Sequence, residues 1–327
     1  MVRTAQSPTP RRQHQLRRTR RARVVRRRPP RSGDTTMNTE PTKPDRIVDP
    51  HVHLWDPART DWYPYLSGRR ELGMGDVSKM SRRFDAGTYI AEATGWNVEK
   101  LVNVAAATGW YSIDETIELD RAAGVNGQPA AIIGGLPPSD SVAEKVAALD
   151  RQLAASRFRG VRPMGAAEGP LPGAEVLRAL ADRELLVEVM VRPDQLLATA
   201  RRLESDDSVV VVIEHAGWPR NGSEAERALW TEGINALGGL GDNVVCKLSG
   251  LAAGLGSMAP DVLGPWLEYA IEAFGVDRCM FASNFPVDGI HGTLDELYSS
   301  YSVVAGRLDH ESRDKLFAAN AERIYRC

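Results

Sequence analysis

The sequence is poor in cysteine and has no long apolar run. Only Cys246, Cys279 and Cys327 occur among 327 residues, and no two of them have a CxxC spacing. This excludes a disulfide framework and a zinc ribbon, and it predicts a reducing, cytoplasmic environment. No apolar run approaches the roughly 18 residues that cross a bilayer, so we predict no membrane partner. The composition, 43% apolar and 26% charged, is otherwise that of a folded protein,.

Acidic and aromatic residues are almost missing from the first 36 residues. This segment has twelve arginines, one acid (Asp34) and no Phe, Trp or Tyr. Its net charge is +11, and because the whole chain carries −2, the other 291 residues carry −13. Such a segment binds nucleic acid only through unspecific, salt-sensitive charge contacts, so we expect no specific nucleic-acid partner. We predict a basic, disordered tail over residues 1–45. A further hypothesis is that translation starts at Met37 and that residues 1–36 are an upstream extension.

From residue 46 onward, short β-rich runs alternate with helical patterns. From the second strand to the eighth, successive predicted starts lie 24 to 35 residues apart, which accommodates one strand and one helix. One of the helices is expected over 139–157, with Ser139 as its N-cap. The pattern predicts a single-domain (β/α)8 barrel, the TIM-barrel fold, over 46–327. A doubly wound open sheet would instead carry a glycine-rich loop after its first strand, and the sequence there has none,. The predicted strands are 46–53, 100–105, 129–136, 158–164, 185–192, 209–215, 243–249 and 278–284.

Three histidines stand where predicted strands end. His51 and His53 close the first strand. Alternate side chains of a strand share one face, so we expect these two, with Asp49, to point into the barrel. His215 closes the sixth strand. Active sites of such barrels lie at the carboxyl ends of the strands, so the three imidazoles are predicted to converge on one site. The alternative is that each is a structural histidine bonded to a neighbour.

Charged side chains on other strands could complete this site. Glu188 interrupts the apolar run of the fifth strand. It either faces the interior, as a base or metal ligand, or forms an ion pair with Arg192 or Arg162. Arg162 and Lys247, on the fourth and seventh strands, could bind an anionic substrate group or hold a carboxylate such as Glu188 in place.

Several motifs in order carry a resemblance to a known family. They are residues 48–57 (VDPHVHLWDP), 214–219 (EHAGWP), 247–250 (KLSG), 283–288 (SNFPVD) and 320–321 (NA). The chain resembles the amidohydrolase-related TIM-barrel hydrolases over residues 46–327. More narrowly, it resembles the lactonase-like branch with fuconolactonase, rhamnonolactonase and 2-pyrone-4,6-dicarboxylate lactonase. The resemblance implies hydrolysis of a lactone, with the strand-one and strand-six histidines in the pocket.

The end of the eighth strand departs from the family pattern. Much of the family has an aspartate there that positions or deprotonates water, whereas this chain has Asn284. An amide is neither a general base nor a good metal ligand. We therefore expect Asp288, in the loop that follows, to be the base, reaching over the barrel mouth while partly solvated, with Glu188 ranked second. One zinc ion, held weakly or not at all, would be bound by His51, His53 and Glu188.

The sequence thus predicts a hydrolase that opens a small anionic lactone. His51, His53 and His215 would polarise the carbonyl and stabilise the oxyanion, directly or through zinc. The residues expected to contact the substrate are Arg162, Lys247, Trp55 and Asn284. Alternatives are a metal-dependent decarboxylase or aromatic-acid hydrolase on the same barrel, and a catalytically silent barrel. The expected partner is a small lactone or carboxylate, and homo-oligomerisation is left open.

Overall fold

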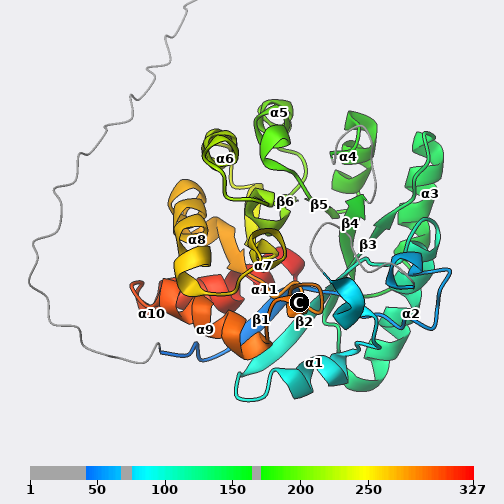
Figure 1. The fold of residues 1–327 in the computed structure, drawn as a ribbon. Helices are drawn as coiled ribbons and strands as arrows, with labels where there is room; N and C mark the ends of the chain where they lie inside the picture. The colour runs from blue at the N-terminus through cyan, green and yellow to red at the C-terminus, as the bar shows by residue number, and fades with distance from the viewer. Residues whose placement is uncertain (1–41, 68–75, 164–170) are drawn as a thin grey trace, which may run out of the picture. The chain divides into compact units, whose positions relative to one another are not determined.

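Eight strands, each hydrogen-bonded to the next in chain order, surround a common interior (Figure 1). All seven neighbouring pairs are parallel. The sheet closes where Val52 pairs with Phe285, just beyond the last strand. The computed structural model describes residues 42–67, 76–163 and 171–327. The strands are β1 (Ile47–Val52), β2 (Val98–Val104), β3 (Ala131–Leu136), β4 (Phe158–Pro163), β5 (Leu186–Val189), β6 (Val211–Ile213), β7 (Val244–Leu248) and β8 (Cys279–Phe281).

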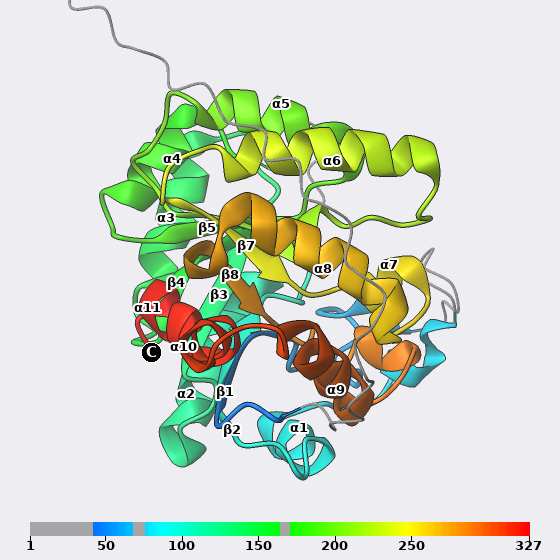
Figure 2. The same ribbon diagram turned by 90° about the vertical axis from the view of Figure 1, so that its left-hand side faces the viewer.

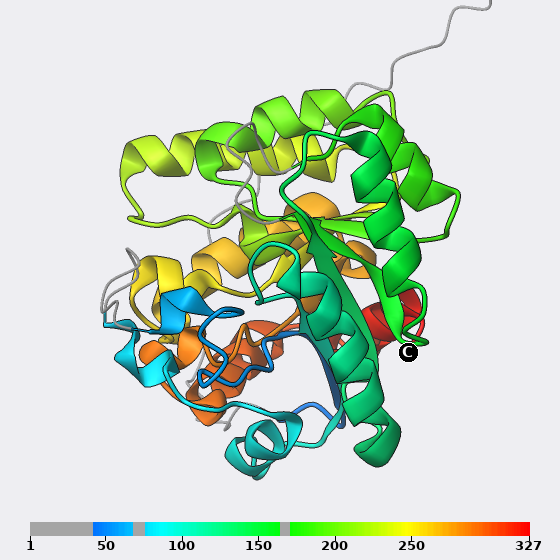
Figure 3. The ribbon, with the colours of Figure 1, turned by 90° about the vertical axis from the view of Figure 1, so that its right-hand side faces the viewer.

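At least one α-helix follows every strand, which confirms the predicted (β/α)8 barrel,. Helices α5 and α6 lie side by side, as do α8 and α9 (Figure 2), and α2 lies beside α3 on the opposite side (Figure 3). None of the helices within the described residues is both long and apolar enough to cross a membrane. The basic segment 1–36 and Met37 lie outside the described residues. The helices are α1 (Ala86–Glu92), α2 (Tyr111–Asn126), α3 (Val142–Gln152), α4 (Ala174–Ala181), α5 (Pro193–Leu203), α6 (Glu224–Gly238), α7 (Leu251–Leu255), α8 (Pro260–Phe274), α9 (Leu294–Ala305), α10 (His310–Asp314) and α11 (Asn320–Tyr325).

Local capping chemistry sets where the helices begin. Helix α5 begins at Pro193, whose missing N–H costs nothing at the first helical position,. Helix α3 begins at Val142, because the hydroxyl of Ser141 accepts the amide of Glu144 as N-cap,. The prediction of Ser139 as the cap is therefore wrong. The Ser139 hydroxyl instead bonds the Glu144 carboxylate at 2.5 Å.

The interior of the barrel has an apolar lower layer and a charged upper layer. On three successive strands a buried apolar side chain is followed two residues later by a buried charged one. Side chains two apart on a strand share a face, so both layers face inward. The charged layer lies toward the carboxyl ends of the strands, where barrel enzymes place their sites. The three apolar and charged pairs are Leu186 and Glu188, Val212 and Glu214, and Val245 and Lys247.

Helix α11 covers the other end of the barrel, where the strands begin. Ala321 and Tyr325 of this helix belong to the same apolar cluster as the inward residues of the strands. Arg159, near the start of β4, donates to the Tyr325 carbonyl at 2.9 Å, and Lys100, near the start of β2, donates to the Cys327 carbonyl at 2.9 Å. The tyrosine ring therefore enters the barrel from below.

Candidate active site

An extra residue in β1 decides which of its side chains enter the barrel. Asp49 pairs with Leu101 and Val52 pairs with Asn103, so three steps on β1 oppose two steps on β2. Such a bulge reverses the alternation of faces. His51 consequently points inward with His53, as predicted. The expectation that Asp49 shares their face is wrong, because the bulge lies between them.

Asp49 instead lies between the barrel and its outer helices. Its Oδ2 accepts the hydroxyls of Tyr89 at 2.5 Å and Tyr298 at 3.0 Å. Its Oδ1 accepts the amides of His51 at 3.1 Å and Ser283 at 2.9 Å. One buried carboxylate thus joins the ends of β1 and β8 and fixes the backbone on which the site residues stand.

His51, in β1, and His53, just after it, form a directed chain of hydrogen bonds. Lys247 Nζ lies 3.4 Å from His51 Nδ1, and His51 Nε2 lies 3.3 Å from His53 Nε2. His53 Nδ1 lies 2.8 Å from the carbonyl oxygen of Val104. A carbonyl only accepts and an ammonium only donates, so His53 carries its proton on Nδ1 and His51 on Nε2. The His51 N–H therefore points at the lone pair of His53.

Both imidazoles are neutral at neutral pH. Burial and the charge of Arg162 lower the pKa of His53 to about 3. Burial, followed by the charge of Lys247, lowers the pKa of His51 well below its usual range. Neutral imidazoles can donate a hydrogen bond to a developing oxyanion without first losing a proton to water.

His215 joins this pair through a left-handed turn after β6. Its φ of 57° lets both Glu214 and His215 face the interior, which consecutive residues of a regular strand cannot do,. The His215 ring centroid lies 4.7 Å from that of His51, and its Nδ1 lies 2.9 Å from the Ser249 hydroxyl. Burial lowers the pKa of His215 well below its usual range. A Cβ on Gly250 would lie 2.3 Å from His215 Nδ1, so only glycine leaves room for the ring.

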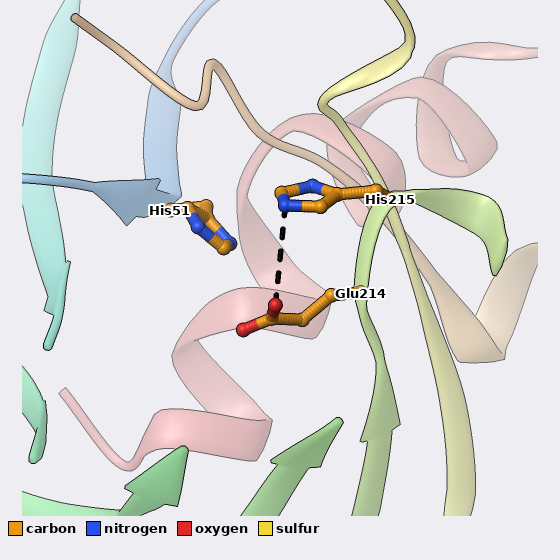
Figure 4. A group of neighbouring side chains, drawn as sticks. All are labelled: His51, Glu214 and His215. Atoms are coloured by element: carbon orange, nitrogen blue, oxygen red, sulfur yellow. Dashed lines mark ion pairs between the residues drawn. The ribbon is translucent and has the colours of Figure 1, made fainter. Parts of the chain in front are cut away.

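Glu214 is the site residue that sequence reasoning missed. It is fully buried, and its Oε2 lies 3.1 Å from Arg162 Nε. The same oxygen lies 3.9 Å from His215 Nε2, and Figure 4 marks this ion pair. Neither oxygen accepts a hydrogen bond from any residue that the structure describes. Burial raises the pKa of Glu214 to about 7, against the opposing charge of Arg162. The signal was present in the sequence, because Val212 and Glu214 repeat the apolar and acidic alternation of Leu186 and Glu188.

Glu188 faces the interior but already has two partners. Its Oε2 accepts the ammonium of Lys247 at 2.5 Å, and its Oε1 accepts the hydroxyl of Tyr325 at 2.6 Å. The predicted ion pair with Arg192 or Arg162 is wrong, because Lys247 of β7, two strands along the barrel, occupies that position. Lys247 is fully buried, so it holds a carboxylate in place, the second of the two roles predicted for it.

The segment after β8 buries the predicted base. Asp288 is 0% exposed, so the expectation of partial solvation is wrong. Its Oδ1 accepts Asn284 Nδ2 at 3.0 Å and the Ala253 amide at 3.2 Å, while Oδ2 accepts no hydrogen bond from the described residues. Burial raises the pKa of Asp288 to about 7. The cause is the short turn that begins at Asp288 and packs on α7 instead of extending over the mouth.

The other predicted substrate contacts lie around the histidines. Trp55 stacks on His53 with ring centroids 5.8 Å apart and planes 4° apart, and its indole N–H donates to the Arg82 carbonyl. Asn284 stands just after β8 with a left-handed φ of 57°, and its Nδ2 donates to Asp288 Oδ1. Arg162 is 8% exposed, and among the described residues its guanidinium makes, besides the contact with Glu214, only long contacts of 3.4 and 3.9 Å. It therefore keeps donor capacity for an anion.

One group in the described chain has the donors for a metal ion. His51, Glu214 and His215 each offer a ligand atom, and these atoms lie within 4.8 Å of one another (Figure 4). Nitrogen and carboxylate donors at this separation fit a divalent ion such as zinc. The predicted set, His51, His53 and Glu188, shares only His51 with this group. The cation Arg162 contacts Glu214, and the cation Lys247 contacts His51. Both positive charges oppose the binding of a metal cation between these ligands.

Comparison with known proteins connects this geometry to a family. Residues 48–327 match the family described as amidohydrolase. The chain belongs to this hydrolase family. The uncharacterized protein y4mH of Sinorhizobium fredii is 30% identical over 297 residues, which cover 86% of this chain and 98% of that protein. L-fucono-1,5-lactonase of Burkholderia multivorans is 26% identical over 298 residues, which cover 85% of this chain and 95% of that enzyme.

A solved structure shows the same relation. The crystal structure of an amidohydrolase from Burkholderia multivorans with bound zinc has a TM-score of 0.71 and 25% sequence identity, covering 86% of this chain and 99% of that one. The resemblance predicted from the motifs, with its lactonase-like branch, is confirmed by these matches.

Proposed function

We propose that this amidohydrolase opens a small lactone that carries a carboxylate. The observation that carries the proposal is the contact of three buried, neutral imidazoles with one another, beside an arginine whose only short contact with the described residues is to Glu214. Lactone hydrolysis needs an electrophilic group for the carbonyl, a proton acceptor for the attacking water and an anchor for the substrate. The similarity to L-fucono-1,5-lactonase supports this choice of reaction class.

The electrophilic group in this proposal is the histidine cluster. The Nε2–H of His51 turns from His53 toward the carbonyl oxygen as negative charge develops there. A neutral N–H donor in a buried site stabilises an oxyanion by several kcal/mol, roughly 3 to 4 in comparable sites. If zinc is bound, His51, Glu214 and His215 would hold it, and it would supply a Lewis acid for the same carbonyl.

A buried carboxylate accepts the proton of the attacking water. Glu188 is unsuited to this role, because Lys247 and Tyr325 occupy its two oxygens. Asp288 and Glu214 each keep an oxygen that accepts no hydrogen bond from the described residues. A pKa of about 7, which both carboxylates share, suits a base that works near neutral pH,. We assign the role to Asp288, because the cation Arg162 contacts Glu214.

Arg162 anchors the carboxylate of the substrate. Its planar fork binds a carboxylate through two parallel hydrogen bonds, which the point charge of a lysine does not reproduce. Lys247 is left out of this role, because it is buried against Glu188.

The test is a hydrolysis screen with matched substrates. The purified protein is assayed for acid release from sugar-acid lactones and from dicarboxylate lactones, and each dicarboxylate lactone is compared with its methyl ester. We expect turnover of a carboxylate-bearing lactone, and Arg162→Lys should raise its KM at least about tenfold while leaving the KM of the ester unchanged. A folded protein that hydrolyses no lactone above the blank overturns the proposal. Release of CO2 from an aromatic acid by that protein would support the decarboxylase alternative instead.

A further inference from the structure

An exposed methionine stands beside the arginine that anchors the substrate in the proposed function. Met190 directly follows β5 and is 36% exposed. Its Sδ lies 3.9 Å from Nη2 of Arg162. Single exposed apolar side chains are common on protein surfaces, so the exposure of Met190 by itself indicates no role. The informative feature is the direction in which this side chain points.

The alternation of β5 continues through Met190 and turns it inward. Leu186 belongs to the apolar cluster inside the barrel, whereas Val189 and Val191 belong to the cluster that packs the barrel against its helices. Met190 lies between these two outward residues and two positions beyond Glu188, so it shares the inward face,. It therefore adds a third inward layer to β5, above the apolar and the charged layers, at the rim where barrel enzymes bind their substrates.

The neighbouring strand places the substrate anchor one layer below this methionine. Val161 of β4 pairs with Val187 of β5. The next residues of the two strands, Arg162 and Glu188, therefore stand at the same level, and the Arg162 guanidinium reaches up from there to the thioether of Met190. A carboxylate forms a charge-assisted bond with arginine that is far stronger than a bond to a thioether. A substrate carboxylate that binds Arg162 consequently displaces the thioether contact and lies against Met190.

We propose that Met190 is a specificity-determining residue, which selects a lactone ring that carries C–H rather than hydroxyl groups beside its carboxylate. The inference rests on the proposed function for the anchor, Arg162. The selection itself is a property of binding and requires no turnover.

The physical argument compares what a hydroxyl and a C–H group gain beside a thioether. The sulfur of Met190 has no proton to donate and accepts hydrogen bonds only weakly. A hydroxyl placed against it loses its water and gains no equivalent partner, whereas a C–H group gains dispersion contact with the polarizable sulfur. An apolar wall rejects an added hydroxyl by about 10² at most. We therefore expect a preference between about tenfold and a hundredfold for the ring without hydroxyls.

Two aromatic side chains near the histidines add apolar surface rather than hydrogen-bonding groups. The indole N–H of Trp55 donates to the Arg82 carbonyl, and the hydroxyl of Tyr65 donates to the Ala106 carbonyl at 2.9 Å. The two rings meet edge to face, with centroids 6.3 Å apart. Because their polar atoms are already bonded to the backbone, these side chains offer a hydroxylated ring no compensation for its contact with Met190.

The experiment measures the binding of two carboxylates with the same ring. The probes are tetrahydropyran-2-carboxylate and glucuronate, whose pyranose ring has the same skeleton with hydroxyl groups added, and each is titrated calorimetrically into the full-length protein. We expect the wild type to bind tetrahydropyran-2-carboxylate at least about tenfold more tightly than glucuronate. Met190→Gln has a similar length and adds an amide that can bond a hydroxyl, so it should reduce this preference to about threefold or less.

Two further variants separate the chemistry of the thioether from other effects. Met190→Leu conserves the apolar volume and should keep the preference of the wild type. Leu229→Gln is the matched control, because Leu229 is an exposed apolar residue of α6, 49% exposed, and the same amide there should leave both affinities unchanged. Equal affinities of the wild type for the two probes overturn the inference, as does a preference that survives in Met190→Gln. Binding of neither probe at millimolar concentration also overturns it, because the carboxylate then has no anchor beside Met190.

Kinetics separate this inference from the proposed function. If no lactone is hydrolysed but the binding preference is present and is lost in Met190→Gln, the proposed function fails and the role of Met190 stands. If lactones are hydrolysed, the ratio of kcat/KM for a carboxylate-bearing lactone without hydroxyls to that for its hydroxylated counterpart should fall at least about tenfold in Met190→Gln. An unchanged ratio overturns the role of Met190 while the proposed function holds.

Discussion

Asp288→Asn tests the electrostatics and the chemistry of the candidate site with a single isosteric change. The asparagine Oδ1 can accept the same two donors, Asn284 and the Ala253 amide, that Asp288 Oδ1 accepts now. Its amide nitrogen takes the place of Oδ2, which has no hydrogen bond from the described residues. The substitution therefore removes the titration of residue 288 and keeps the two hydrogen bonds to its Oδ1.

The magnitude follows from the raised pKa. Burial raises the pKa of Asp288 from 3.8 to about 7, so between these values the folded state keeps a proton that the unfolded state has released. The stabilisation from Asp288 is therefore complete below pH 3.8 and is lost as the pH rises through 7. Between pH 5 and pH 8 the titration of Asp288 should lower the free energy of unfolding of the wild type by roughly 3 kcal/mol. The variant has no such titration and should not show this decrease.

The assay is urea unfolding of the wild type and Asp288→Asn at both pH values, together with lactone turnover. From pH 5 to pH 8, the free energy of unfolding of the variant should rise by roughly 3 kcal/mol relative to that of the wild type. Burying the amide of the variant lowers its free energy of unfolding by about 1 to 3 kcal/mol at both pH values, so this cost does not affect the pH dependence. Turnover should fall by about 10² or more if Asp288 is the base. A variant that hydrolyses the lactone at the wild-type rate refutes the assignment of the base. An equal pH dependence of unfolding in both proteins refutes the raised pKa.

Three further predictions concern the histidines and the metal. His53→Ala should lower kcat/KM by about 10² or more with the fold intact, and a fully active, folded variant would remove the reaction from this end of the barrel. Gly250→Ala should displace the ring of His215 and strain a positive φ,, so circular dichroism should show a folded protein whose kcat has fallen at least about tenfold. Glu214→Gln should weaken zinc binding about tenfold or more in isothermal titration, and unchanged affinity would exclude Glu214 as a ligand.

The order of strands and helices was predictable from the sequence because it depends on local patterns. Val209–Ile213 and similar apolar runs have the length and continuity of buried parallel strands,. The spacing between them leaves room for one helix each, and right-handed crossovers then leave few arrangements. Helix starts were less predictable, since Ser139 and Ser141 are both acceptable caps and only the packed structure selects between them,.

The histidines of the candidate site were also predictable, and for the same reason. His51, His53 and His215 stand at the ends of strands, and in a parallel barrel all strand ends of one kind meet at one rim. Periodicity alone failed where the backbone departs from regular geometry. The bulge in β1 turned Asp49 outward, and the left-handed conformation of His215 allowed Glu214 and its neighbour to point inward together.

The sequence by itself determined the barrel and the rim on which its histidines stand, because a strand's alternation and a helix's period are set by neighbours along the chain. Only the tertiary structure decided the partners of the buried charges. Glu188 is held by Lys247, 59 positions away, and by Tyr325, 137 positions away. A buried carboxylate must be paired, but several cations could have satisfied it. The choice depends on which side chains the closed barrel brings within hydrogen-bond distance, and no local pattern encodes that distance.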